Sequence, residues 1–350
     1  MINNTSRRQL LKSAGAAALS APFIHGASKS GAQKLILGEG AYKFEATHDW
    51  GELPASIKYG NTHGVVEDSH GRIYVFHTVH KTSVKTDAMV VFDAKGKFVT
   101  SWGSEYAGGA HGLHIQKEGN AEYLYLCDTK RSTVTKTTLD GKVLLTLGYP
   151  KESDKYRMDK DSKPLVKYIP TNLAVAANGD IFVGDGYGSS FINKYSKDGV
   201  FLKTFGGGKT KEKGSTNSPH GIFIDARSGK EELVVADRSN NRLQYFSLDG
   251  EHLRFVTQDM ASPCHFSFRK DLMLIPDLAA RVQILDKNNK MVANLGDDSK
   301  SEWRKTRVME RDQFKAGKFV APHGACFDHK GNIFVSEWVE VGRITKLRKV

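Results

Sequence analysis

The sequence predicts an all-β protein, a six-bladed β-propeller. Similar segments recur along the 350 residues, and each contains short apolar or aromatic stretches of strand length. Turns with Gly separate these stretches roughly every ten residues, as in Asn178-Gly179 and Lys330-Gly331. Gly is frequent, with 34 residues, and Pro is scarce, with 9, which suits many tight turns. Four strands in a unit of about 40 to 60 residues are typical of a propeller blade.

Six repeats account for most of the chain. They span residues 62–103, 110–148, 169–206, 218–256, 262–296 and 321–350. The last repeat supplies only three strands, but "AYKFEATHDWG" at 41–51 resembles "GKFVTSWG" at 96–103. We therefore expect the N-terminal strand to complete the last blade, which closes the ring and removes free strand edges. Residues 31–350 then form one domain, and the polar inserts 149–168 and 297–319 are loops between blades.

The first 30 residues have the pattern of a twin-arginine export signal. "SRRQLLK" contains Arg7 and Arg8, and "SAGAAALSAPFI" follows, with small residues leading to a cleavage site near Ala27. We therefore expect a periplasmic or secreted protein; the alternative is a chance pair of arginines. The apolar run is too short for a permanent membrane span.

Charge and cysteine content limit which binding partners and disulfides we expect. The formal net charge is +12. The sequence has no dense block of Lys and Arg with interleaved aromatic residues, so we do not expect the protein to bind nucleic acid. We expect a monomer that takes a small-molecule or peptide substrate, with anionic compounds among the candidates. The cysteines Cys127, Cys264 and Cys326 allow at most one disulfide. We expect Cys264 and Cys326 to be core residues whose side chains point away from the channel.

In five of the six repeats a histidine opens the innermost strand. These positions, which should lie at one height around the propeller axis, are His63, His111, Asn172, His220, His265 and His323. Alternate blades stand about 120° apart in a six-bladed ring, so His111, His220 and His323 should point at one axis. Three neutral imidazoles in this arrangement predict a site for zinc or another transition metal, with open positions. The alternative is that each imidazole only bonds a neighbouring backbone carbonyl.

Other polar side chains near these positions are candidates for contact with substrate. His63 and His265 could extend the site, and His77 and His80 follow the second strand of the first repeat. Tyr187 could act as a general acid or base if a nearby cation lowers its pKa. Arg238 could bind a carboxylate or an oxyanion. The alternatives are a turn tyrosine and an arginine paired with an acid of a neighbouring blade.

The stretch "PTNLAVAANGDIFVGDGYGSSFINKYSKDGVFLKTFG", with "SPHGIFID" and "VVADRSNNRLQYF" after it, resembles the peptidyl-α-hydroxyglycine α-amidating lyases. The resemblance extends over the six repeats and is strongest at 169–250. It implies a zinc ion held by His111, His220 and His323, with Tyr187 as a catalytic group and Arg238 lining the site. Two positions depart from the family: Thr78 stands where an arginine is expected, and Gly324 replaces an aspartate that helps to bind a structural calcium ion.

Two functions of different classes follow. The first is an exported metal-dependent enzyme, a lyase or hydrolase, with a substrate pocket altered from that of the amidating lyases. The second is a non-catalytic NHL-repeat propeller whose loops bind a protein, glycan or peptide, since a fold alone does not determine function.

Overall fold

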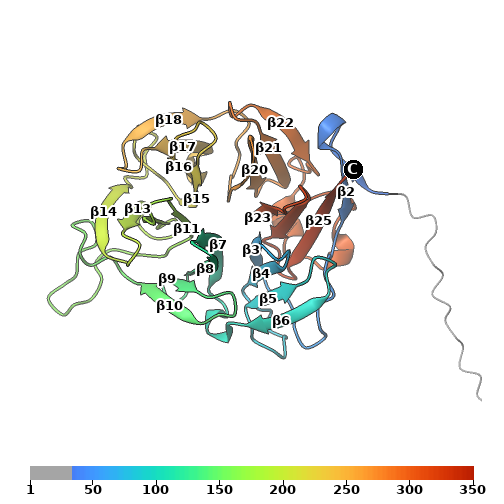
Figure 1. Ribbon diagram of the computed structural model, residues 1–350, viewed down its shortest axis with the longest axis horizontal. Coiled ribbons are helices and arrows are strands. Elements are labelled where there is room, and N and C mark those ends of the chain that lie inside the picture. Colours follow the sequence, from blue (N-terminus) through green and yellow to red (C-terminus); the bar gives the residue numbers. More distant parts are fainter. Residues whose placement is uncertain (1–33) are drawn as a thin grey trace, which may run out of the picture. The chain divides into compact units, whose positions relative to one another are not determined.

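The computed structural model describes residues 34–350, and the predicted export signal at 1–30 lies outside them. Residues Leu35–Val350 form one compact unit. This unit is built from six small antiparallel sheets arranged in a ring, which confirms the predicted six-bladed β-propeller (Figure 1). Helical structure in the described residues is limited to single turns, of which α1 (Trp303–Thr306) is the only α-helical one.

The blades follow one another along the chain, each running from the channel outward. Blade 1 holds β3 (Thr62–Glu67), β4 (Ile73–His77), β5 (Met89–Phe92) and β6 (Phe98–Trp102). Blade 2 holds β7 (Ala110–Glu118), β8 (Ala121–Asp128), β9 (Thr133–Thr137) and β10 (Val143–Leu147). Blade 3 holds β11 (Asn172–Val175), β12 (Ile181–Gly184), β13 (Phe191–Tyr195) and β14 (Phe201–Gly206). Blade 4 holds β15 (Pro219–Asp225), β16 (Glu232–Asp237), β17 (Arg242–Phe246) and β18 (His252–Val256). Blade 5 holds β19 (Ser267–Arg269), β20 (Leu272–Asp277), β21 (Arg281–Leu285) and β22 (Met291–Leu295).

Blade 6 closes the ring with strands from both ends of the described chain. It contains β23 (Pro322–Phe327), β24 (Ile333–Glu337) and β25 (Arg343–Lys349). The N-terminal strand β2 (Phe44–Thr47) pairs with β25, as predicted from the repeat pattern. A short fifth strand, β1 (Ile36–Leu37), pairs with β2 at the outer edge; the four-strand pattern did not predict it.

The hydrophobic core lies between the blades. Buried side chains of blades 1 and 2, such as Phe76 and Leu124, pack together in one cluster, and corresponding clusters fill the other interfaces. Each blade therefore buries both of its faces against its neighbours, and this packing fixes how the inner strands approach the axis.

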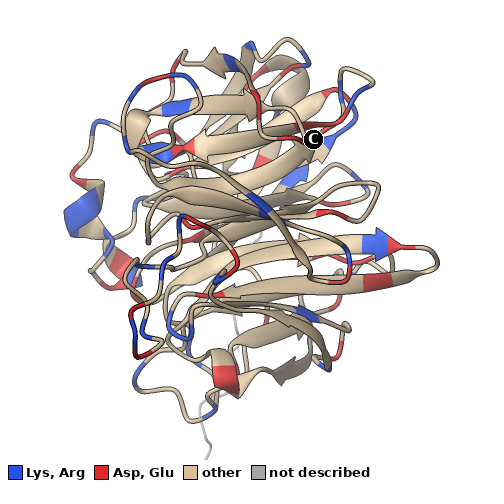
Figure 2. Ribbon diagram, turned by 90° about the vertical axis from the view of Figure 1, so that its left-hand side faces the viewer, with Lys and Arg blue, Asp and Glu red and all other residues tan. Residues whose placement is uncertain are grey.

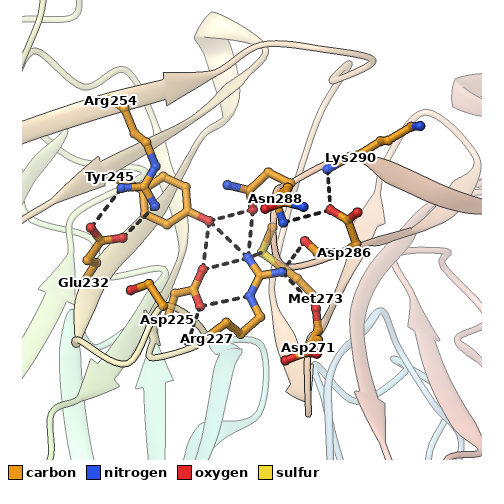
Figure 3. Close-up of polar contacts among 12 residues, drawn as sticks. Asp225, Arg227, Glu232, Tyr245, Arg254, Asp271, Met273, Asp286, Asn288 and Lys290 are labelled. Carbon is orange, nitrogen blue, oxygen red and sulfur yellow. Dashed lines mark hydrogen bonds and ion pairs between the residues drawn. The ribbon is translucent and has the colours of Figure 1, made fainter.

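Polar contacts reinforce at least one of these interfaces (Figure 3). Arg227, which follows β15, forms an ion pair with Asp225 of its own blade at 2.7 Å. The same guanidinium reaches blade 5, where it donates to the Asp286 carbonyl at 2.6 Å and to Asn289 Oδ1 at 2.8 Å. A buried arginine that satisfies its donors across a blade interface fixes the angle between the two blades.

Charged residues do not gather into one basic block on the side of the unit drawn in Figure 2, where both signs are interspersed.

Among the described residues, no helix is long and apolar enough to cross a membrane. All three cysteines are buried and unpaired.

Candidate metal centre

The His-Gly pairs are explained by how closely neighbouring inner strands approach. A Cβ atom built on Gly112, Gly221 or Gly324 would lie only 2.4–2.5 Å from a backbone carbonyl oxygen of the next blade. Real Cβ atoms do not come this close to a carbonyl oxygen, so only glycine allows the approach. The three oxygens belong to Thr171, Cys264 and His63, in that order.

These same carbonyl oxygens orient the three predicted ligands. Nδ1 of His111 lies 2.7 Å from the Thr171 oxygen, Nδ1 of His220 lies 3.0 Å from that of Cys264, and Nδ1 of His323 lies 3.0 Å from that of His63. A carbonyl only accepts, so each Nδ1 carries the proton and each Nε2 presents a lone pair. The predicted bond to a neighbouring carbonyl and the predicted ligand role are therefore compatible.

The three rings meet with nearly threefold spacing. Their centroids are 4.9 Å apart for His111 and His220, and 4.7 Å apart for each of the two pairs that include His323. The ring of His63 adds to the group, with centroids 4.6 Å from His111 and 4.4 Å from His323. All four histidines are buried.

Tyr187, which follows β12, lies over this cluster. Its hydroxyl oxygen is 3.1 Å from Nε2 of His111 and 3.1 Å from Nε2 of His220. The phenol has one proton, so it satisfies one of these two lone pairs. His63 Nδ1 lies 3.3 Å from His323 Nε2 and can satisfy that acceptor. One buried nitrogen lone pair still lacks a donor, and a cation bound by the imidazoles would resolve this deficit.

The groups of side chains whose possible metal-donor atoms lie nearest one another differ from the predicted set of three histidines. The donor atoms of His63, His111 and His323 lie within 4.8 Å of one another, and so do those of His220, Cys264 and His323. Neither group contains both His111 and His220, whose Nε2 atoms each lie 3.1 Å from the Tyr187 hydroxyl. Cys264 therefore points toward the site, and the expectation that its side chain faces away from the channel was wrong. Strand alternation does not apply there, because Cys264 precedes β19 and lies outside any strand.

Burial keeps the imidazoles uncharged. It lowers the pKa of His111 to about 3, and it lowers the pKa of His63, His220 and His323 well below their ordinary value. The positive charge of Arg238 lowers the pKa values of His220, His111 and His63 further. Neutral imidazoles are the form that binds a metal.

Arg238, at the end of β16, lies beside the tyrosine. Its guanidinium carbon is 5.3 Å from the centroid of the Tyr187 ring, and its Nη1 is 3.9 Å from the Cys264 sulfur. Burial raises the pKa of the Tyr187 hydroxyl, and the charges of Arg238 and Arg307 oppose this rise. Tyr187 as a whole residue is 36% exposed, so it lies at the boundary between the buried histidines and solvent.

The other predicted substrate contacts lie apart from this cluster. His265 Nδ1 is 2.8 Å from the amide nitrogen of Asn172. The ring of His265 lines a cavity of about 100 Å³ together with His114. Burial lowers the pKa of His265 to about 3.

The two histidines of the β4–β5 region have different surroundings. His77 is fully buried, accepts a hydrogen bond at Nδ1 from Val79, and packs against Tyr59 with ring centroids 4.9 Å apart. His80 is half-buried and lines a separate groove of about 510 Å³ together with Tyr59 and Arg311. Their roles as substrate contacts stay predictions.

Sequence reasoning missed Cys264 and Arg307 as parts of the site. The sulfur could have been suspected from its position next to His265. Arg307 comes from the 297–319 insert, which has no counterpart in the other repeats, so no repeat position pointed to it.

The chain resembles several known proteins. No family model matches it. It is 31% identical over 171 residues to peptidyl-alpha-hydroxyglycine alpha-amidating lyase 2 of Drosophila melanogaster, a match that covers 48% of this chain and 39% of the relative. It is 28% identical over 218 residues to lyase 1 of the same organism, covering 55% of this chain and 38% of the relative. The chain thus spans about two fifths of the length of these curated relatives.

Solved structures support the fold. A streptogramin B lyase superposes with a TM-score of 0.57 and 13% identity, covering 89% of this chain and 99% of that one. A gluconolactonase from Xanthomonas campestris also gives a TM-score of 0.57, with 12% identity over 87% of this chain and 89% of that one. The chain is therefore a six-bladed β-propeller with buried His-rich groups that could bind a metal, and its relatives by sequence are peptidyl-α-hydroxyglycine α-amidating lyases.

Proposed function

We propose that the protein is an exported metal-dependent enzyme, and that it acts as a lyase on α-hydroxyglycine-type substrates. The observation that carries this proposal is the orientation of His111, His220 and His323 by three backbone carbonyls. Their Nε2 atoms would hold zinc or another transition metal. Such an ion would supply a Lewis acid that binds the substrate hydroxyl and makes its proton easier to remove.

The reaction that fits the relatives' name converts an acylated α-hydroxyglycine into an acyl amide and glyoxylate. The bond between the α-carbon and the nitrogen breaks, the hydroxyl loses its proton as the new C=O bond forms, and the nitrogen gains a proton. The numbers of protons removed and added are equal, so one side chain could move the proton between the two sites.

Tyr187 is in position for that proton transfer. Its hydroxyl already lies in hydrogen-bonding range of two proposed ligands, beside the place where the substrate hydroxyl would bind. The neighbouring charges of Arg238 and Arg307 stabilise the phenolate. Arg238 would hold the substrate carboxylate, the group that becomes part of glyoxylate.

Release of glyoxylate from N-benzoyl-α-hydroxyglycine by the metal-loaded protein tests this proposal. We expect metal-dependent release that is lost on chelation and restored by added zinc or another transition metal. Absence of glyoxylate from fully loaded protein would contradict the lyase assignment. The non-catalytic binding propeller would then become the better account.

A further inference from the structure

Arg307 comes from outside the repeats but contacts Asn61, which directly precedes the inner strand of blade 1. It follows α1, and its backbone is fixed by a bond from its own N–H to the Trp303 carbonyl at 2.9 Å. Its carbonyl accepts a bond from the N–H of Glu340 at 3.0 Å. The loop that bears Arg307 is therefore attached to the β24–β25 connection of blade 6.

The side chain of Arg307 is held just as firmly. Its guanidinium carbon is 3.4 Å from the ring centroid of Trp338, and its Nε donates to the Trp338 carbonyl at 3.2 Å. Its Nη2 donates to Asn61 Oδ1 at 3.2 Å. Asn61 lies two residues before His63, so the guanidinium reaches the entry of the inner strand of blade 1.

Arg307 and Arg238 lie at the same end of the channel. Arg238 directly follows β16, and Trp338, on which Arg307 stacks, directly follows β24, the corresponding strand of blade 6. One cation therefore comes from blade 4 and the other from the insert that precedes blade 6.

Neither cation has a carboxylate partner. Other arginines of the described chain, such as Arg227, Arg242 and Arg343, form ion pairs. No ion pair involves Arg238 or Arg307 within residues 34–350, and no acceptor among them bonds Nη1 of Arg307. A half-buried guanidinium with unused donors favours an anion, and a planar carboxylate matches its geometry.

We propose that Arg307 and Arg238 together form a carboxylate-binding site above the imidazoles, with Arg307 as a specificity-determining residue. This inference deepens the proposed function, because it assigns the recognition of the substrate carboxylate to two arginines rather than one. The 297–319 insert thus contributes directly to the site.

Binding of N-benzoylglycine and of its neutral amide to the metal-loaded protein, measured by calorimetry, tests the inference. Neither probe has the α-hydroxyl, so neither is cleaved. We expect the acid to bind at least about tenfold more tightly than the amide. Arg307→Gln and Arg238→Gln should each weaken binding of the acid about ten- to hundredfold and leave that of the amide unchanged. Arg307→Lys should be intermediate, because it keeps the charge and loses the planar fork.

Arg304→Gln is the matched control. Arg304 is exposed on the same helical turn, and its guanidinium carbon lies 4.3 Å from the ring centroid of Trp303. It should bind the acid as the wild type does. Equal affinity of the wild type for acid and amide, undetectable binding of the acid, or an Arg307→Gln variant that binds the acid normally would each overturn the inference. Loss of folding in Arg307→Gln is monitored by metal content and melting temperature. A protein that prefers the acid but releases no glyoxylate from the hydroxylated substrate would refute the lyase and leave the carboxylate site standing.

Discussion

Alternate blades of this propeller open their inner strands in two different ways. In blades 2, 4 and 6 the imidazole Nδ1 of the first histidine is hydrogen-bonded to a backbone carbonyl of the next blade. In blades 1, 3 and 5 the corresponding side chains bond one another or a ligand candidate instead: Asn172 contacts His265, and His63 contacts His323.

The difference shows what the proposed ligand positions have in common besides a histidine. His265 has the same residue type and the same place in the repeat as His220, but a side-chain amide occupies its Nδ1. The second element is a backbone carbonyl of the next blade, which fixes the tautomer and approaches closely because glycine follows the histidine. Gly64 also follows His63, but its Cβ position faces the side chain of Leu113 and not a carbonyl. His265 is followed by Phe266 and lacks this element.

The largest expected effect is on glyoxylate release, when the Tyr187 hydroxyl that lies over the three oriented imidazoles is removed. Tyr187→Phe removes the hydroxyl that lies within hydrogen-bonding range of both His111 and His220, so glyoxylate release should fall about 10²- to 10⁴-fold. Metal content should not change, because the imidazoles keep their carbonyl partners. A variant with wild-type turnover in a steady-state assay would show that the proton moves by another route.

Removing a histidine should affect metal affinity differently in the two sets of blades. His220→Asn removes a proposed ligand. It should therefore lower metal affinity by more than the roughly 10- to 100-fold that loss of a residue supporting a ligand costs. His265→Asn should keep wild-type affinity in a chelator-competition titration. Equal loss in both variants would mean that the alternate pattern has no role in metal binding.

The glycine of the His-Gly pair can be tested separately from the ligand. Gly221→Ala places a Cβ 2.4 Å from the Cys264 carbonyl that holds His220. We expect a loss of about 1–3 kcal/mol in the free energy of unfolding and weaker metal binding. Gly148→Ala is the control, because no atom lies within 4 Å of its Cβ position. Similar urea midpoints for the two variants would remove the steric argument.

Acid should lower the free energy of unfolding of the metal-free protein partly through His265, which is not one of the three proposed ligands. The pKa of His265 is about 3 in the folded chain because of burial, whereas the unfolded chain has the ordinary value near 6.5. The unfolded state therefore takes up a proton below about pH 6.5 that the folded state refuses, so stability falls as pH drops. At pH 5 this histidine should account for about 2 kcal/mol of the loss. His265→Leu should reduce the decrease between pH 7 and pH 5 in denaturant titrations by that amount; an unchanged decrease would refute it.

The smallest effect is expected from the partner of His265. Asn172→Ala removes two buried hydrogen bonds of 2.8 Å each, one to His265 Nδ1 and one from the Leu173 N–H, and should cost about 1 kcal/mol of unfolding free energy. Metal affinity should stay at the wild-type value. A clear change in metal affinity would connect blade 3 to the site and weaken the contrast between the two sets.

The repeat pattern predicted most of the fold, because each blade repeats the same strand and turn signals. Closure by β2 was also predictable, since the last repeat lacks a strand that the segment 41–51 resembles. The histidine positions followed from the same periodicity. The direction of the Cys264 side chain did not, because that residue precedes its strand, where alternation gives no orientation. Arg307 was not predictable either, since its place depends on how an insert without repeat symmetry packs on Trp338.

Elemental analysis of the folded protein tests the central claim most directly. The wild type should be compared with the His111→Ala/His220→Ala/His323→Ala variant and with His265→Ala, all purified without chelator. Our account predicts about one transition metal per chain in the wild type and in His265→Ala, and none in the triple variant. Absence of metal from the wild type even after zinc or copper is added, or retention of metal by the triple variant, would contradict it.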